Sequence, residues 1–133
     1  MLCDFGLSVR WREKEFQETV GTLTYMAPEL ISQQRYGFPV DIWAFGVVSY
    51  LVAFAEYPFE ESTPESIFTR LHEVDFLGDS TMVACVSTGI RVIIAGMLQW
   101  RAQERLSALQ ILTRMNAHSN ERSMSEGKCS RHK

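Results

Sequence analysis

The most apolar part of the chain lies between Asp41 and Glu56, and no charged residue occurs between these two. Its large apolar side chains fall on every face of a 3.6-residue period, which predicts a buried helix. The β-branched valines leave a strand open, but apolar runs beyond about 10–12 residues favour helix. Pro39 and Asp41 are typical of a helix start. We therefore expect a central helix over about 41–55, with the other elements packed around it.

Shorter segments around this helix carry their own start signals. Residues 7–20 are mostly polar and predict a surface loop. Pro28 suits the first turn of a short helix, and Thr63 followed by Pro64 predicts a cap and the first position of another. In that second helix, Ile67, Phe68 and Leu71 would share one face. Apolar residues from 90 to 98 predict a further helix, although Gly96 weakens it.

The last part of the chain differs in character from the rest. Residues 116–133 contain no aromatic residue and many Ser, Arg, Lys and Asn residues. Segments of this composition bury too little apolar surface to offset the entropy of ordering. We therefore expect a disordered tail over 116–133 and a single small domain over 1–115.

Composition excludes several classes of function. The 133 residues are 46% hydrophobic, as in a globular protein, and the net charge of −3 gives no basic stripe for nucleic acid. The uncharged run is shorter than the roughly 20 residues of a membrane span. The three cysteines lack metal spacing, and the chain opens without a leader-like segment. We expect a cytoplasmic or nuclear protein with no nucleic-acid or membrane partner.

Three motifs follow one another along the chain. They are Asp4-Phe5-Gly6, then Gly21-Thr22-x-x-Tyr25-Met-Ala27-Pro28-Glu29, then Asp41-Ile-Trp43-Ala-Phe-Gly46. In order and spacing they resemble the C-terminal lobe of a eukaryotic protein kinase, and three linked motifs are far more specific than one.

The resemblance implies a mainly α fold. It would be a partial kinase C-lobe over 1–115, with an activation segment from 4 to 29 followed by helix F at about 41–55 and by helices G, H and I. Helix G would be the helix that starts at Pro64. The N-lobe and the catalytic loop would be lacking. The pattern around Thr22 resembles the serine/threonine kinases, and Tyr57-Pro-Phe59 leans toward the calmodulin-dependent-kinase group.

The resemblance also implies cofactors. In the family, the residue that matches Asp4 holds the Mg²⁺ that bridges the ATP phosphates, and a carboxylate oxygen suits this hard cation. Phe5 matches the aromatic residue whose packing sets the active state, and Gly6 completes the motif. ATP and Mg²⁺ are therefore the expected cofactors, with Asp4 as the metal ligand.

Other matched positions concern the protein substrate and regulation. Gly21, Thr22 and Tyr25 fall on the loop that holds the substrate residue after the acceptor. The position of the family's usual phosphorylation site falls on Glu18. Its carboxylate would either imitate a constitutive negative charge at that site or be one more acid on a solvated loop. Thr19, beside it, is the alternative acceptor.

The remaining matched residues would be structural. Glu29 would pair with Arg105, 76 positions away, unless the two are unrelated surface charges. Asp41 would bind the catalytic-loop backbone, cap the helix, or both. Arg101-Ala102 stands where the family has Asp-Pro, so we expect a looser turn before Arg105 and its short helix. The other structural positions are Ala27, Pro28, Trp43 and Gly46.

Three hypotheses of function follow. The first is an enzyme, the C-terminal part of a serine/threonine kinase that phosphorylates a protein substrate. The second is a non-catalytic binding module that docks a regulatory protein through helix G and the activation segment. The third is a fragment from a split or misread gene whose start was assigned to an internal Met. The 133 residues contain no Gly-rich loop, ATP-contacting lysine or catalytic Asp. We therefore expect the isolated chain to be inactive and helix F to be only partly covered.

Overall fold

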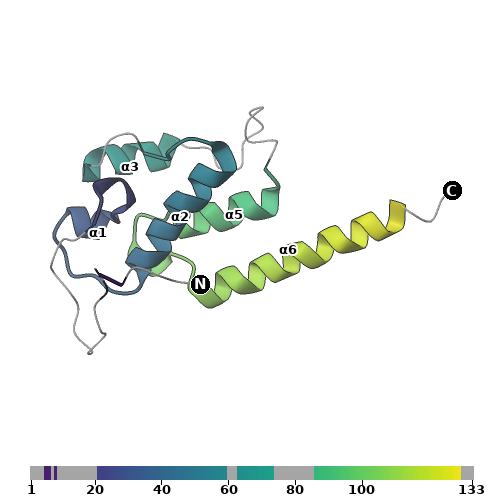
Figure 1. Ribbon diagram of the computed structural model, residues 1–133. Coiled ribbons are helices and arrows are strands. Elements are labelled where there is room, and N and C mark those ends of the chain that lie inside the picture. Colours follow the sequence, from purple (N-terminus) through teal and green to yellow (C-terminus); the bar gives the residue numbers. More distant parts are fainter. Residues whose placement is uncertain (1–4, 7, 9–20, 60–62, 74–85, 130–133) are drawn as a thin grey trace.

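The computed structural model describes residues 5–6, 8, 21–59, 63–73 and 86–129, and this part of the chain is mainly helical, as predicted. Helix α2, Pro39–Phe54, runs through the middle of the bundle (Figure 1). Around it lie a short helix, two helices of ten residues and one long C-terminal helix. They are α1 (Pro28–Ile31), α3 (Pro64–Glu73), α5 (Thr88–Met97) and α6 (Ala108–Cys129). Two 3₁₀ turns, η1 (Leu23–Tyr25) and η2 (Ala102–Glu104), complete the described elements.

Local start signals account for three of the helix beginnings. Pro28 and Pro39 occupy the first turns of α1 and α2, where a missing N–H costs nothing. At α3 the Thr63 hydroxyl accepts a hydrogen bond from the Ser66 N–H at 3.2 Å, so the predicted cap is present. Asp41 does not cap α2, because the cap position falls on Phe38 and Asp41 lies in the first turn.

The core forms where α2 and α5 meet. Trp43 and Val47 of α2 have no exposed surface, and Ile94 and Met97 of α5 are 1% exposed. Gly46 lets the two helices approach closely, since an added Cβ would lie 2.9 Å from Leu98 Cδ2. Ile67 of α3 and Ile111 of α6 belong to the same cluster. The four longer helices therefore share one core.

Helix α2 is not buried on all faces, contrary to the sequence prediction. Its buried side carries Trp43 and Val47, but Phe45, Val48 and Val52 are 49%, 43% and 81% exposed. These three residues follow one another at helical spacing and form one stripe. The prediction that this chain would cover only part of the helix is confirmed. An apolar period alone does not reveal whether enough partner surface is available.

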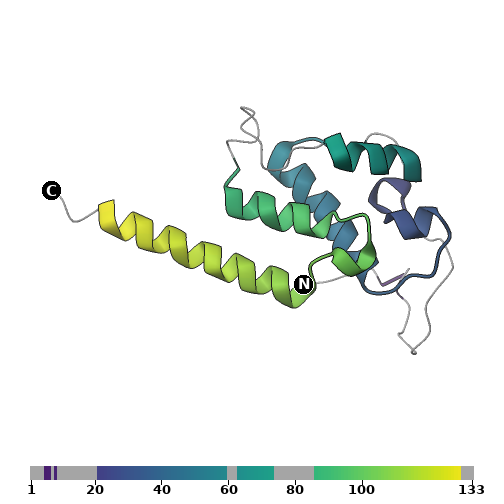
Figure 2. The ribbon, with the colours of Figure 1, turned by 180° about the vertical axis from the view of Figure 1, so that it is seen from behind.

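Helix α6 differs most from the sequence prediction. It continues to Cys129, where a short helix and then a disordered tail over 116–133 were expected, and both views show it extending beyond the bundle (Figures 1 and 2). Ser107 and Gln110 form a capping box, with Ser107 N–H to Gln110 Oε1 at 2.7 Å and Gln110 N–H to Ser107 Oγ at 3.3 Å. Once the first turn is formed, each further residue that becomes helical adds one hydrogen bond, so a helix extends more easily than it starts. A polar composition therefore did not exclude a helix.

The middle of α6 also contacts the bundle. The Nε2 atom of His118 lies 2.9 Å from Ser87 Oγ, just ahead of α5. Gly89 leaves space for the imidazole, because a Cβ there would lie 2.6 Å from His118 Nδ1. This contact, between residues 31 positions apart, helps to hold α6 against α5.

Among the described residues, no helix is both long and apolar enough to cross a bilayer.

Candidate activation-segment site

The segment from Gly21 to Tyr25 is an exposed turn ahead of α1. Gly21 has φ +118°, a backbone conformation that glycine adopts without a Cβ clash. Thr22 is exposed, and its carbonyl accepts a hydrogen bond from the Tyr25 N–H at 3.0 Å. The turn η1 therefore places the Thr22 side chain at the surface, where another molecule can reach it.

Tyr25 contacts a residue that follows α2. Its hydroxyl lies 3.2 Å from the hydroxyl of Tyr57, and the two rings meet edge to face with centroids 6.2 Å apart. The hydrogen bond with Tyr57 raises the pKa of Tyr25 above its usual value, with smaller contributions from the charge of Tyr57 and from burial. The contact links the exposed turn to the end of the central helix.

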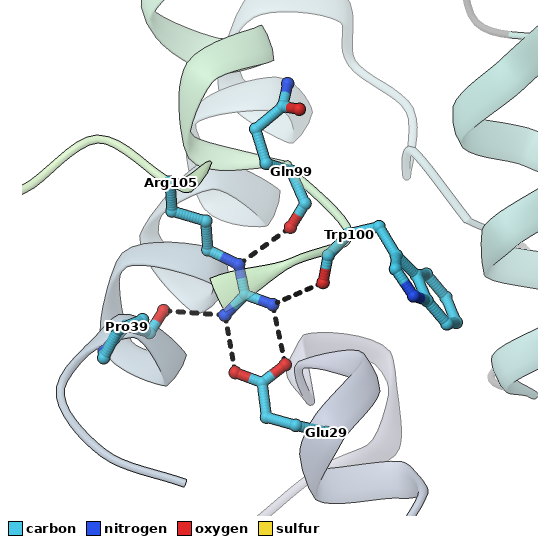
Figure 3. A network of polar contacts seen from close by, with 5 residues as sticks. All are labelled: Glu29, Pro39, Gln99, Trp100 and Arg105. Carbon is cyan, nitrogen blue, oxygen red and sulfur yellow. Dashed lines mark hydrogen bonds and ion pairs between the residues drawn. The ribbon is translucent and has the colours of Figure 1, made fainter. Parts of the chain in front are cut away.

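Glu29 and Arg105 form a bidentate ion pair (Figure 3). Arg105 Nη1 donates to Glu29 Oε1 at 2.7 Å, and Nη2 donates to Oε2 at 2.6 Å. The two side chains are only 1% and 10% exposed. The predicted pair is thus present, and it joins α1 to the turn that precedes α6.

Backbone carbonyls complete the surroundings of Arg105. Nε donates to the Gln99 carbonyl at 2.9 Å, Nη1 to Pro39 at 3.0 Å and Nη2 to Trp100 at 3.2 Å. Together with Glu29 these acceptors use all five N–H donors of the guanidinium (Figure 3). A buried charge is tolerated when it is both paired and hydrogen-bonded. Arg105 meets both conditions.

Trp43 forms the apolar side of this network. The Arg105 Cζ atom lies 5.0 Å from the Trp43 ring centroid, a cation–π contact. On the same side chain, Phe59 stacks at 5.3 Å with an interplanar angle of 10°. Ala27 has no exposed surface and belongs to the same cluster. The structural residues named from the sequence are therefore largely brought together here.

The turn before Arg105 is regular, contrary to the looser turn expected from Arg101-Ala102. Residues Ala102–Glu104 form the 3₁₀ turn η2, and the Arg105 N–H donates to the Ala102 carbonyl at 3.3 Å. An ion pair of 3.1 Å between Arg101 and Glu104 spans this turn. The backbone pattern therefore does not need the Asp-Pro sequence.

Several predicted site residues are not brought to this place. Asp4 and Thr19 lie outside the described residues, so their predicted roles stay predictions. Phe5 is 67% exposed in a turn with Gly6, and its ring does not belong to the core cluster. Asp41 is exposed. Among the described residues, no three His, Cys, Asp or Glu side chains are grouped as metal ligands.

Sequence reasoning missed the contact of Tyr57 with Tyr25 and the carbonyls of Pro39, Gln99 and Trp100. A backbone acceptor has no side-chain signature, so no sequence pattern could reveal those three. Tyr57 was named from the sequence only as part of Tyr57-Pro-Phe59, which does not indicate a partner.

Comparison with known proteins extends this local description to most of the chain. Residues 1–115 match the family described as protein kinase domain. The chain is 36% identical over 111 residues to Aurora kinase C of Mus musculus, a match that covers 84% of this chain and 39% of that protein. It is 32% identical over 112 residues to calcium/calmodulin-dependent protein kinase type 1B of Homo sapiens, covering 84% of this chain and 33% of the relative.

A third relative is calcium-dependent protein kinase 25 of Oryza sativa subsp. japonica. It is 36% identical over 110 residues, which cover 82% of this chain and 20% of that protein. The chain therefore spans well under half the length of each of these relatives.

Proposed function

This chain belongs to the protein kinase domain family, and on that premise we propose that it is the C-terminal part of a serine/threonine protein kinase. The reaction would be transfer of the terminal phosphoryl group of ATP to a Ser or Thr hydroxyl of a protein. The observation that supports this most is the buried Glu29–Arg105 pair, with two bonds of 2.6 and 2.7 Å. It ties the segment that would hold the substrate to the helical core.

The chain's own residues would contribute positioning. Phosphoryl transfer depends on holding the nucleotide and the acceptor in line, with little covalent chemistry by the protein. The exposed Thr22 and the turn η1 would hold the acceptor segment, while Tyr25 and Tyr57 would hold the turn. Thr19 would be the acceptor of a regulatory phosphate.

Magnesium would be held through Asp4. A carboxylate oxygen is the ligand type that Mg²⁺ prefers, and nucleotide phosphates commonly supply others. The bound ion would neutralise charge on the ATP phosphates. Asp4 alone supplies too few oxygen ligands to hold Mg²⁺ in a kinase site. The remaining protein ligands and the catalytic base would have to come from a catalytic loop. None of the 133 residues matches that loop, and we expect the isolated chain to transfer no phosphate.

A chimera tests the proposal. Residues 1–115 would replace the matching part of calcium/calmodulin-dependent protein kinase type 1B, which keeps its own preceding elements. We expect phosphate incorporation into a Ser/Thr peptide and none into a Tyr peptide, with loss of incorporation on Asp4→Asn. Glu104→Gln, an exposed acid far along the chain, serves as the matched control. A folded chimera without ATP-dependent transfer would refute the proposal.

A second candidate function is a non-catalytic module that docks a regulatory protein through α3 and the activation segment. It is favoured by Phe68 of α3, which was expected to share one face with Ile67 but is 46% exposed, whereas Ile67 is 2% exposed. Phe68→Ser should then weaken capture of the chain's own regulator and leave transfer by the chimera unchanged. If Phe68→Ser instead alters only the melting temperature, Phe68 acts in packing and this candidate fails.

A further inference from the structure

A groove of about 550 Å³ opens between the α1–α2 connection and the turn η2. We name it the η2 groove, and the residues that matter for its chemistry are Gln34, Arg35, Phe38, Trp100, Arg101 and Gln103. It lies beside the Glu29–Arg105 pair, which fixes the two segments that form its walls. The volume suits a few residues of an extended peptide and is far too small for a folded domain.

The walls of the η2 groove offer apolar surface. Phe38, one of the lining residues, is 64% exposed. The Trp100 carbonyl points to Arg105 while its indole points away from the network (Figure 3). That indole is held edge to face against Phe68 at 5.2 Å. A held aromatic ring loses little entropy when another side chain packs on it.

Two arginines and one acid line the η2 groove. Arg35, which also takes part in another interaction, and Arg101 both line it, and the acid, Glu29, already accepts from Arg105 with both oxygens. Arg101 pairs with Glu104, but these side chains are 68% and 49% exposed. Exposed pairs of this kind are weak, so a second carboxylate can compete for Arg101. With Glu29 neutralised by Arg105, the two arginines leave a surplus of positive charge, which favours an acidic partner.

We propose that the η2 groove docks an extended acidic segment of a partner protein. One apolar side chain of that segment packs against Phe38 and Trp100, and flanking carboxylates lie at Arg35 and Arg101. A long polyanion such as nucleic acid fits less well, because the two arginines of the groove neutralise few phosphates. The proposal goes beyond phosphoryl transfer and holds whether or not the chain is part of an active kinase.

The test is a binding titration of the 133-residue chain. The probe is a fluorescein-labelled, end-blocked peptide Glu-Leu-Glu-Phe-Glu, followed by anisotropy, with Lys-Leu-Lys-Phe-Lys as its counterpart. We expect saturable binding of the acidic peptide that weakens with salt, and no binding of the basic one. The double variant Arg35→Glu with Arg101→Glu should weaken acidic-peptide binding by roughly tenfold or more and gain binding of the basic peptide.

Three controls separate docking from folding and from general charge. Arg114→Glu makes the same change on an exposed position of α6 outside the groove and should leave binding unchanged. Glu104→Gln should strengthen binding, because Arg101 loses its competitor. Circular dichroism must show equal helix content in all variants. Absence of acidic-peptide binding, equal binding by the doubly reversed chain, or equal loss on Arg114→Glu would each overturn the proposal.

Discussion

Removing the charge of Glu29 is the most informative perturbation of this chain. Glu29→Gln keeps the shape of the side chain but leaves the guanidinium of Arg105 buried without a counter-charge. Breaking a buried pair in this way costs about 3–5 kcal/mol, against about 1 kcal/mol or less for an exposed pair. The side chains of Arg105 and Glu29 are only 1% and 10% exposed, so we expect the larger loss of stability, that of a buried pair. Three carbonyls still bind the guanidinium, which favours the lower end, about 3 kcal/mol.

The measurement is urea unfolding followed by circular dichroism. A typical domain has an unfolding free energy of about 5–15 kcal/mol. A loss of about 3 kcal/mol therefore lowers the urea concentration at the unfolding midpoint by a clearly measurable amount. Glu104→Gln is the matched control, since it removes the carboxylate of the exposed pair with Arg101. We expect that control to lose less than about 1 kcal/mol.

A double-mutant cycle shows whether the loss belongs to the pair. Arg105→Met alone strands the Glu29 carboxylate, whereas Glu29→Gln with Arg105→Met leaves no buried charge. We expect the double variant to be more stable than the sum of the two single losses predicts. If Glu29→Gln costs no more than Glu104→Gln, or if the two losses simply add, the assignment of this pair as the tie between the segment and the core is refuted.

Three further predictions concern the helices. Ala55 ends α2 with φ 59°, where glycine is favoured, so Ala55→Gly should raise the unfolding free energy by up to about 1 kcal/mol in urea. Gly96→Ala would place a Cβ 2.6 Å from Leu106 Cδ1 and should lower the melting temperature, at a cost of about 1–3 kcal/mol. Burial, then the charge of Glu56, raises the pKa of Tyr50. The neutral phenol of Tyr50 therefore stabilises the folded state fully below pH 10, and this stabilisation is lost as the pH rises through the folded-state pKa. Tyr50→Phe should reduce the loss of unfolding free energy at alkaline pH.

Much of the candidate site followed from residue identity. The Glu29–Arg105 pair could be predicted from two motifs 76 positions apart, and the structure contains it. The regular turn at Arg101 could not, because the sequence departs there from the family pattern while the 3₁₀ backbone is kept. Several side chains can satisfy one turn geometry, so the loss of a preferred residue does not predict the loss of the turn.

The sequence alone indicated where α1, α2 and α3 begin, because Pro at a first turn and Thr at a cap act within three or four residues. Tertiary structure decided which faces are covered. Val47 and Val48 are neighbours in one apolar run, yet the first is fully buried and the second is 43% exposed. Burial depends on which distant segments supply partner surface, and no local pattern contains that information. The carbonyls around Arg105 were decided in the same way, by contacts between segments far apart in the sequence.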